Sequence, residues 1–327
     1  MKDLFQRIIE NKGPLGKWAS IAEGYFVFPK LEGPISNRMN FNGKEVITWS
    51  VNDYLGLANN PEVREIDSEA AQKFGSAHPM GARMMSGHTE LHEKLEKILS
   101  DLVNKESSYV LNFGYQGILS TIDTLVSKND VIVYDSDSHA CIIDGVRLHL
   151  GKRFTYKHND IESLEKNLIR ASKVANNSDG GILVISEGVF GMRGEQGKLK
   201  EIVELKEKYK FRFLVDDAHG FGTLGKNGSG TGHEQGVQGQ IDVYFATFAK
   251  SIASTGAFIA GSKEVIDFLK YNMRSQMFAK SLQSVLVYGI IKRIEMMKSR
   301  PEFKKRLWEN VYSLQEGLKN RGFDIGN

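Results

Sequence analysis

The chain has 327 residues, of which 41% are hydrophobic and 25% are charged, and its 43 Lys and Arg residues nearly balance its 40 Asp and Glu residues. This is the composition of a globular protein with one large core or two unequal domains, and the net charge of +3 gives no reason to expect nucleic acid or an anionic membrane as a partner. The single cysteine, Cys141, excludes an intramolecular disulfide and suits a reducing compartment. No stretch approaches the roughly 18 apolar residues of a membrane span, so we expect a soluble, cytoplasmic protein.

The first residues, MKDLFQRIIENKG, predict an amphipathic helix without the uninterrupted apolar core of a signal peptide. Helical patterns follow in TELHEKLEKILSDLVNK, DIESLEKNLIRAS and KLKEIVELKEKY. Between them recur short runs rich in β-formers, at 108–112, 131–135, 153–157, 182–186, 212–216, 243–247 and 257–261. Several of these runs are almost continuously apolar, as in strands covered on both faces. The alternation predicts an α/β fold with a mostly parallel sheet wrapped by helices.

From about residue 281 the pattern becomes helical, and GFDIGN at the end of the sequence has the pattern of a new strand. We therefore expect an N-terminal arm over 1–60, a large domain over 61–290, and over 291–327 the beginning of a small C-terminal α/β domain. The end of the sequence inside this pattern suggests a truncated chain.

Three short motifs resemble binding sites for a dinucleotide, for zinc and for calcium. GFGTLG (220–225) matches G-x-G-x-x-G, but KNGSGTGHEQG follows it where a dinucleotide site needs a helix, so a glycine-rich loop is the better interpretation. HTELH places His88 and His92 at a spacing that can bind zinc, but the apolar stripe beside His92 favours a packed or capping histidine. YDSDSH (134–139) lacks the longer ligand series of a calcium loop and fits a solvated loop. We expect no metal site.

Polar residues of types that can take part in catalysis lie at or just after the ends of several predicted strands. Asp216 ends one strand, Thr247 ends the next and is followed by Lys250, and His139 follows a third. Ligands of open α/β sheets collect beyond the carboxyl ends of the strands, so these residues can converge. Lysine is rarely buried without a reason, and burial can lower its pKa enough to free the amine as a nucleophile. A lysine with an aspartate for a pyridinium nitrogen is the pattern of a pyridoxal phosphate (PLP) site.

With these residues in place, the sequence resembles the α-oxoamine synthases, PLP enzymes of fold type I that condense an amino acid with an acyl thioester and release CO2. The family includes serine palmitoyltransferase, 8-amino-7-oxononanoate synthase and 2-amino-3-ketobutyrate CoA ligase. The resemblance runs from NDYLGLANNP (52–61) to the end of the chain, and KSIASTGAFIAGSKEVIDFLKYNMRSQMF is most similar to bacterial serine palmitoyltransferases. Its other blocks are GARMMSGHTELHEKLE, NFGYQGILS, DSHACIIDGVRL, YKHNDIESLE, SEGVFGMRGE, VDDAHGFGTLGKNGSGT and TFAKSIASTGAFIAG.

The resemblance implies PLP as the cofactor and gives a role to each matching residue. Lys250 would hold the cofactor covalently and later carry the Cα proton, Asp216 would keep the pyridine nitrogen protonated, and His139 would stack on the ring. His219 would hydrogen-bond the ring's phenolic oxygen. Contacts with the cofactor's phosphate would come from Gly114, Tyr115 and Thr247.

The sequence also departs from the family pattern. Ala249 stands where the palmitoyltransferases have serine, Gly191 where the family usually has serine, and Arg193 where it has an acidic residue. Ala279 and Lys280 replace small hydroxyl residues that would reach the partner subunit's phosphate. These changes bear on the amino-acid substrate more than on the cofactor, and Arg193 suggests a more anionic amino acid such as cysteate.

The implied function is the condensation of a serine-like amino acid, or glycine, alanine or cysteate, with an acyl-CoA or acyl-carrier-protein, giving an aminoketone for a sphingolipid or a related sulfonolipid. The alternatives are 8-amino-7-oxononanoate synthase, an aminotransferase or aldol-type lyase of the same fold, and a regulatory subunit without activity. Lys250, Asp216 and both histidines argue against the last. The family implies a homodimer with its active sites at the subunit interface, and an arginine for the substrate carboxylate that lies beyond residue 327.

Overall fold

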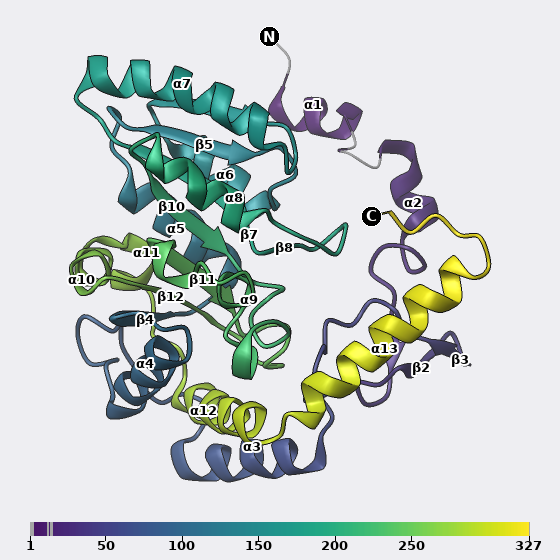
Figure 1. The fold of residues 1–327 in the computed structure, drawn as a ribbon. Helices are drawn as coiled ribbons and strands as arrows, with labels where there is room; N and C mark the ends of the chain where they lie inside the picture. The colour runs from purple at the N-terminus through teal and green to yellow at the C-terminus, as the bar shows by residue number, and fades with distance from the viewer. Residues whose placement is uncertain (1–2, 12, 14–15, 327) are drawn as a thin grey trace. The chain divides into compact units, whose positions relative to one another are not determined.

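The structure is a computed structural model that describes residues 3–11, 13 and 16–326 (Figure 1). The chain divides into two compact units, Met1–Val51 and Asn52–Asn327. The second unit contains both the large sheet and the final helices, and the expected domain boundaries near residues 60 and 290 stay predictions.

The first unit contains the expected amphipathic helix and a small antiparallel sheet. Helix α1 spans Leu4–Asn11, and after it come η1 (Gly16–Trp18) and α2 (Ala19–Ala22). Asn42 and Gly43 both have positive φ, the conformation that two-residue hairpin turns require, and they join β2 to β3. The strands of this sheet are β1 (Leu31–Glu32), β2 (Arg38–Phe41) and β3 (Lys44–Ile47).

A seven-stranded sheet forms the centre of the second unit, in the order β4-β12-β11-β10-β7-β5-β6. The five strands from β11 to β6 are parallel, whereas β12 is antiparallel to both of its neighbours. The strands are β4 (Ser107–Leu111), β5 (Val131–Asp135), β6 (Lys152–Tyr156), β7 (Ile182–Glu187), β10 (Arg212–Asp216), β11 (Val243–Thr247) and β12 (Ala257–Gly261). A separate short hairpin consists of β8 (Val189–Phe190) and β9 (Glu195–Gln196).

Helices connect these strands and cover the sheet. The α-helices of the second unit are α3 (Pro61–Phe74), α4 (Glu90–Leu102), α5 (Gly114–Leu125), α6 (Ala140–Leu148), α7 (Ile161–Ser178), α8 (Leu199–Glu204), α9 (Thr231–Glu234), α10 (Lys263–Asn272), α11 (Arg274–Met277), α12 (Ser284–Ser299) and α13 (Glu302–Lys319). Short 3-10 turns occupy Leu205–Glu207, Lys226–Gly228 and Gln238–Gln240. Helix α12 packs against α3 and α4, as Figure 1 shows. No helix among the described residues is long and apolar enough to cross a bilayer.

Alternate residues of the central strands point to opposite faces of the sheet, and each face has its own apolar cluster. Val184 and Val215 belong to one cluster, with residues of α4, α7 and α12. Ile185 and Leu214 belong to the other, with residues of α5 and α6. Both faces are therefore covered, which explains the almost uninterrupted apolar sequence of these strands.

The structure confirms the α/β fold and each of the seven predicted strands, with ends that differ by at most one residue from the predicted ranges. It also confirms the helical character after residue 281. The strand predicted at the end of the sequence is wrong for the described residues, because 323–326 form neither strand nor helix.

Candidate active site

Three neighbouring strands end in polar residues on the same face of the sheet. Asp216 ends β10 and lies directly opposite Glu187, the last residue of β7, while Thr247 ends the adjacent β11. In each strand, the residue two positions earlier (Leu214, Ile185 or Phe245) belongs to the apolar cluster formed with α5 and α6. Because strand residues two apart point to the same side, all three polar side chains point toward that face of the sheet. They are 4% (Asp216), 4% (Glu187) and 7% (Thr247) exposed, so this edge of the sheet carries two buried carboxyl groups.

The two helices that cover this face begin beside the same strand ends. Gly114 is the first residue of α5, and a Cβ atom placed on it would lie 3.1 Å from Oγ1 of Thr247. Phe113 provides no side-chain cap for α5, so the first N–H groups of the helix lack the usual side-chain acceptor. His139 is the N-cap residue of α6, and its ring lies edge-on to that of Tyr115, with 6.2 Å between the ring centroids. A bare helix start favours an anion, and His139 lies next to it.

Lys250 lies in the loop that joins β11 to β12 and is half-buried. Its Nζ is 2.9 Å from Nε2 of His219, and the other ring nitrogen of His219 is 2.7 Å from the hydroxyl of Tyr54. Burial, followed by the charges of Lys250 and His139, lowers the pKa of His219 to about 4, so its imidazole is neutral near pH 7. A protonated Lys250 donates to Nε2, which leaves the proton of the ring on Nδ1, facing Tyr54.

Lys250 and Asp216 influence each other without forming an ion pair in the described part of the chain. Burial lowers the pKa of Lys250, although the charges of Asp216 and Glu187 oppose this effect. Burial likewise raises the pKa of Asp216, against the charge of Lys250. A lysine with a lowered pKa supplies more neutral amine near pH 7, as a nucleophile requires.

His139 is held by two residues that the sequence had not placed at the site. Its backbone N–H donates to the carboxylate of Glu187 at 2.5 Å. Its Nδ1 lies 2.8 Å from the sulfur of Cys141, which is 3.9 Å from Asp216. Burial and the charge of Asp216 raise the pKa of Cys141, so it stays a thiol and can donate its proton to Nδ1. His139 is thereby linked to both carboxyl groups.

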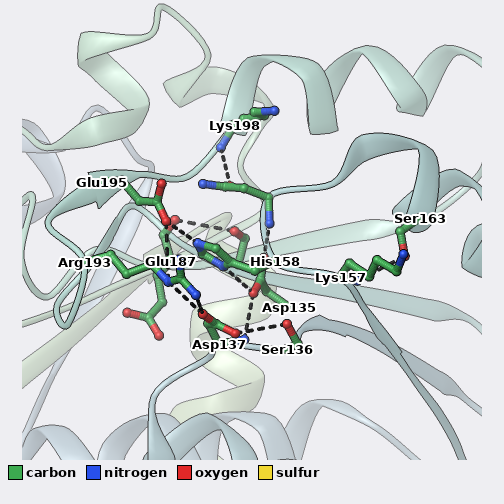
Figure 2. Close-up of polar contacts among 12 residues, drawn as sticks. Asp135, Ser136, Asp137, Lys157, His158, Ser163, Glu187, Arg193, Glu195 and Lys198 are labelled. Carbon is green, nitrogen blue, oxygen red and sulfur yellow. Dashed lines mark hydrogen bonds and ion pairs between the residues drawn. The ribbon is translucent and has the colours of Figure 1, made fainter. Parts of the chain in front are cut away.

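The β8–β9 hairpin approaches the same site. A Cβ atom on Gly191 would lie 2.3 Å from Nε2 of His219, so only glycine fits there without movement of the histidine. Arg193, in the turn of the hairpin, forms an ion pair with Asp137 at 2.8 Å, and His158 lies between Asp135 (2.8 Å) and Glu195 (2.5 Å). Figure 2 shows these residues together. Their ion pairs join the hairpin to the ends of β5 and β6.

The interpretation of YDSDSH as a solvated loop is wrong for Asp135, which is fully buried. Its side chain accepts hydrogen bonds from His158 and from the backbone N–H groups of Asp137 and Asn159. Ligand atoms of Asp135, Asp137 and His158 lie within 4.8 Å of one another. Both ring nitrogens of His158 are already engaged by carboxylates, so we assign no metal to this group.

The two other motifs have structural roles. His92 is fully buried, and its ring nitrogens contact the Leu282 carbonyl at 3.0 Å and the Thr89 hydroxyl at 2.8 Å, as expected for a packed histidine. His88 lies before α4 and pairs with Glu93 at 2.8 Å. GFGTLG forms turns rather than the start of a long helix, which confirms the glycine-rich loop.

The chain is similar in sequence and in fold to known proteins. Residues 44–327 match the family described as aminotransferase class I and II. The chain is 68% identical over its full 327 residues to a cysteate-C-fatty acyltransferase of Capnocytophaga ochracea, covering 78% of that protein. It is 37% identical over 92% of its length to a serine palmitoyltransferase of Sphingobacterium spiritivorum, of which it covers 74%. It also superposes on serine palmitoyltransferase from S. paucimobilis with a bound PLP–myriocin aldimine, with a TM-score of 0.89, 30% identity, and coverage of 99% of this chain and 80% of that one.

The chain belongs to the aminotransferase class I and II family and has the PLP fold of type I. Within this class it is an α-oxoamine synthase, a PLP-dependent C-acyltransferase that condenses an amino acid with an acyl thioester. The described residues fit PLP: Asp216 is a buried carboxyl group without an ion-pair partner among them, Lys250 lies nearby, and the uncapped start of α5 is suited to a phosphate. The cofactor predicted from the sequence is thus confirmed.

The sequence analysis did not identify Tyr54, Glu187 and Cys141 as site residues. Glu187 could have been found, because it ends an apolar strand as Asp216 does. Tyr54 lies in the block NDYLGLANNP, but its partner His219 is 165 residues away, and no local pattern links the two.

Proposed function

We propose that this chain condenses cysteate with a fatty acyl thioester, and that Lys250, Asp216, His139 and His219 form its PLP site. The observation that carries the choice of amino acid is the 68% identity, over the whole chain, to a cysteate-C-fatty acyltransferase. The Cα of cysteate would bond to the acyl carbon as the thiol of the thioester leaves; loss of CO2 and return of a proton would then give an aminoketone that carries a sulfonate, a building block for a sulfonolipid.

PLP, when bound, supplies the electron sink that allows the Cα proton of the amino acid to leave. Asp216 would accept a hydrogen bond from the protonated pyridine nitrogen, and its burial would strengthen this interaction. His139, at the start of α6, would cover one face of the ring. Once the Lys250 amine is joined to the cofactor and no longer donates to Nε2, neutral His219 would carry its proton on Nε2 and could donate it to the phenolic oxygen, while Nδ1 accepts from the Tyr54 hydroxyl.

Lys250 would hold the cofactor through its amine, and the same amine, when free, would take the Cα proton of the amino acid and return one. The lowered pKa of Lys250 supports both roles, because a neutral amine is needed for each. The uncapped N-terminus of α5, with Gly114 and Tyr115, would hold the phosphate. Thr247 lies beside Gly114, and its hydroxyl donates to the Gly256 carbonyl at 3.0 Å, so we assign it to shaping the phosphate site through its position against α5.

Arg193 does not carry the cysteate proposal. Its guanidinium pairs with Asp137 and Glu195, which accounts for its charge within the hairpin. The identity to the relative therefore carries the choice of substrate.

The choice of amino acid is tested by turnover of the PLP-loaded protein with cysteate, serine and glycine, each with the same fatty acyl-CoA. We expect the highest kcat/KM with cysteate and CO2 release that requires the thioester. Equal or better turnover of serine or glycine would contradict the substrate proposal, and amino transfer to a keto acid would contradict the reaction.

The attachment residue is tested separately by borohydride reduction of the PLP-loaded protein and peptide mapping. We expect the label on Lys250 and none in Lys250→Ala. Lys105 is an internal control, because burial lowers its pKa to about 8 while its Nζ contacts the backbone carbonyls of Gln238 and Ile241 at 2.5 Å. A label on Lys105 would show that low pKa alone directs the reaction.

We further propose that the protein acts as a homodimer in the cytoplasm. Two neighbouring segments carry exposed apolar side chains: Met80 (74% exposed) and Met85 (76%) on one, and Phe278 (71%) on the other. A hydrogen bond of 2.9 Å from the Ser281 N–H to the Gly81 carbonyl joins the two segments. Exposed apolar side chains so grouped are typical of a surface covered by a partner. Light scattering with size-exclusion chromatography should give twice the mass of the chain, and a monomer at micromolar concentration would contradict the dimer.

A further inference from the structure

Glu187 is a buried acid at the active-site edge to which neither the sequence nor the reaction has yet given a role. It ends β7 in register with Asp216, and both side chains point to the face covered by α5 and α6. It is 4% exposed and forms no ion pair within the described residues. An unpaired buried charge is costly, so such a carboxyl group is expected to hold its proton.

Titratable groups from several elements lie near Glu187. Asp216 faces it from β10, and Lys250 follows β11. The others are Asp135 at the end of β5, His139 and Cys141 at the start of α6, and Tyr156 at the end of β6. Burial, then the charge of Asp216, raises the pKa of Glu187 to about 8, although the His139 N–H and the charge of Lys250 act in the opposite direction. Near pH 7 the side chain is therefore mainly a neutral acid.

A neutral carboxylic acid still accepts a hydrogen bond through its carbonyl oxygen. In Glu187 that acceptor meets the backbone N–H of His139 at 2.5 Å, and His139 is the residue whose ring we assign to the face of the cofactor. Figure 2 includes Glu187 among the polar groups of this edge. The contact fixes the backbone at the start of α6 and hence the direction of the His139 ring.

We propose that Glu187 is a positioning residue that acts as an uncharged hydrogen-bond acceptor for the His139 backbone and so orients the His139 ring over the cofactor. With the cofactor bound, the protonated pyridine nitrogen would keep Asp216 ionised, and an uncharged Glu187 would add no second negative charge beside it. The proposal rests on the assignment of His139 and Asp216 to the PLP site, but not on the choice of amino acid.

The test compares Glu187→Gln, which keeps a neutral acceptor, with Glu187→Ala, which removes it. PLP affinity is measured by fluorescence titration at pH 7, together with the absorption spectrum of the bound cofactor. We expect Glu187→Gln to bind PLP within about threefold of wild type and with the same spectrum, and Glu187→Ala to bind it about tenfold more weakly, because the buried N–H loses its partner.

Asp217→Asn is the matched control. Asp217 is a buried acid one residue from Asp216, but its carboxylate binds Thr231 and Tyr244 on the opposite face of the sheet. We expect this variant to leave PLP affinity and the spectrum unchanged.

The protonation of Glu187 is tested in the PLP-free protein by thermal unfolding from pH 5 to 9. The unfolded chain ionises Glu187 near its ordinary pKa while the folded chain does so near 8, so wild type should lose melting temperature relative to Glu187→Gln up to about pH 8. Two results overturn the proposal: Glu187→Gln as weak in PLP binding as Glu187→Ala, or Glu187→Ala as tight as wild type. Because no amino acid is present, these results are independent of the cysteate assignment.

Discussion

Replacement of Gly191 by alanine should displace His219 and slow the reaction. The new Cβ would lie 2.3 Å from Nε2 of His219, well inside van der Waals contact. The ring cannot simply turn away, because Tyr54 holds one nitrogen at 2.7 Å and Lys250 lies 2.9 Å from the other. The hairpin cannot easily retreat either, since ion pairs from Arg193 and Glu195 join it to the ends of β5 and β6.

Overpacking of a tight site costs about 1–3 kcal/mol. Since each 1.4 kcal/mol corresponds to a factor of ten in rate, we expect Gly191→Ala to lower kcat/KM by roughly 5- to 150-fold. Gly191→Ser should do at least as much, although serine is the residue that the family resemblance leads us to expect. The chain is thus committed to glycine by the position of its hairpin.

The assay is steady-state kinetics of the PLP-loaded variants, with the absorption spectrum as a second measurement of the Lys250 environment. Gly239→Ala is the control, because Gly239 is exposed and a Cβ there meets nothing within 4 Å. Unchanged kinetics and spectrum in both Gly191 variants would refute the argument, since they would mean that the hairpin moves without cost.

Three further predictions concern stability. Burial raises the pKa of Asp217 from 3.8 to about 6, so the unfolded chain ionises this residue at a lower pH than the folded chain does. Asp217 should therefore lower the unfolding free energy of wild type by about 3 kcal/mol between pH 4 and 6. Chemical denaturation should show that Asp217→Asn lacks this decrease. Leu99→Ala, at a fully buried position, should cost about 2–5 kcal/mol by the same measurement, whereas a loss below 1 kcal/mol would contradict the packing of α4. Burial acts to lower the pKa of His158, but its hydrogen bonds to Asp135 and Glu195 outweigh burial, and the net shift is upward. Wild type should therefore lose unfolding free energy relative to His158→Gln as the pH rises through the pKa of His158. If the unfolding free energies of the two proteins change with pH in parallel, a charged His158 is excluded.

The sequence predicts the central sheet well because the signal there is local. Strands such as 131–135 and 212–216 are short apolar runs between helical patterns, and burial on both faces is what those runs require. The convergence of Asp216, Thr247 and His139 follows from the same logic, since parallel strands bring their carboxyl ends to one edge. The small sheet of β1, β2 and β3 had no such signal and was not predicted.

The remaining features depend on contacts between distant parts of the chain. From the sequence, Arg193 was interpreted as a positive charge for an anionic substrate. In the structure it pairs with Asp137, which lies 56 residues earlier in the sequence. Asp135 ends a predicted strand where a solvated loop was expected, yet it is fully buried and accepts hydrogen bonds from His158 and Asn159, 23 and 24 residues away. Such pairs are set by tertiary packing, which no short pattern records.

The antiparallel strand β12 has a consequence for motion around Lys250. Thr247 and Ala257 pair across β11 and β12, so the nine residues between them are closed at their base by two central strands. Amide protons of β11 and β12 should consequently exchange with solvent together and slowly, even where the lysine loop itself exchanges quickly. The Lys250 amine can therefore change its orientation during turnover while the backbone hydrogen bonds between β11 and β12 stay intact.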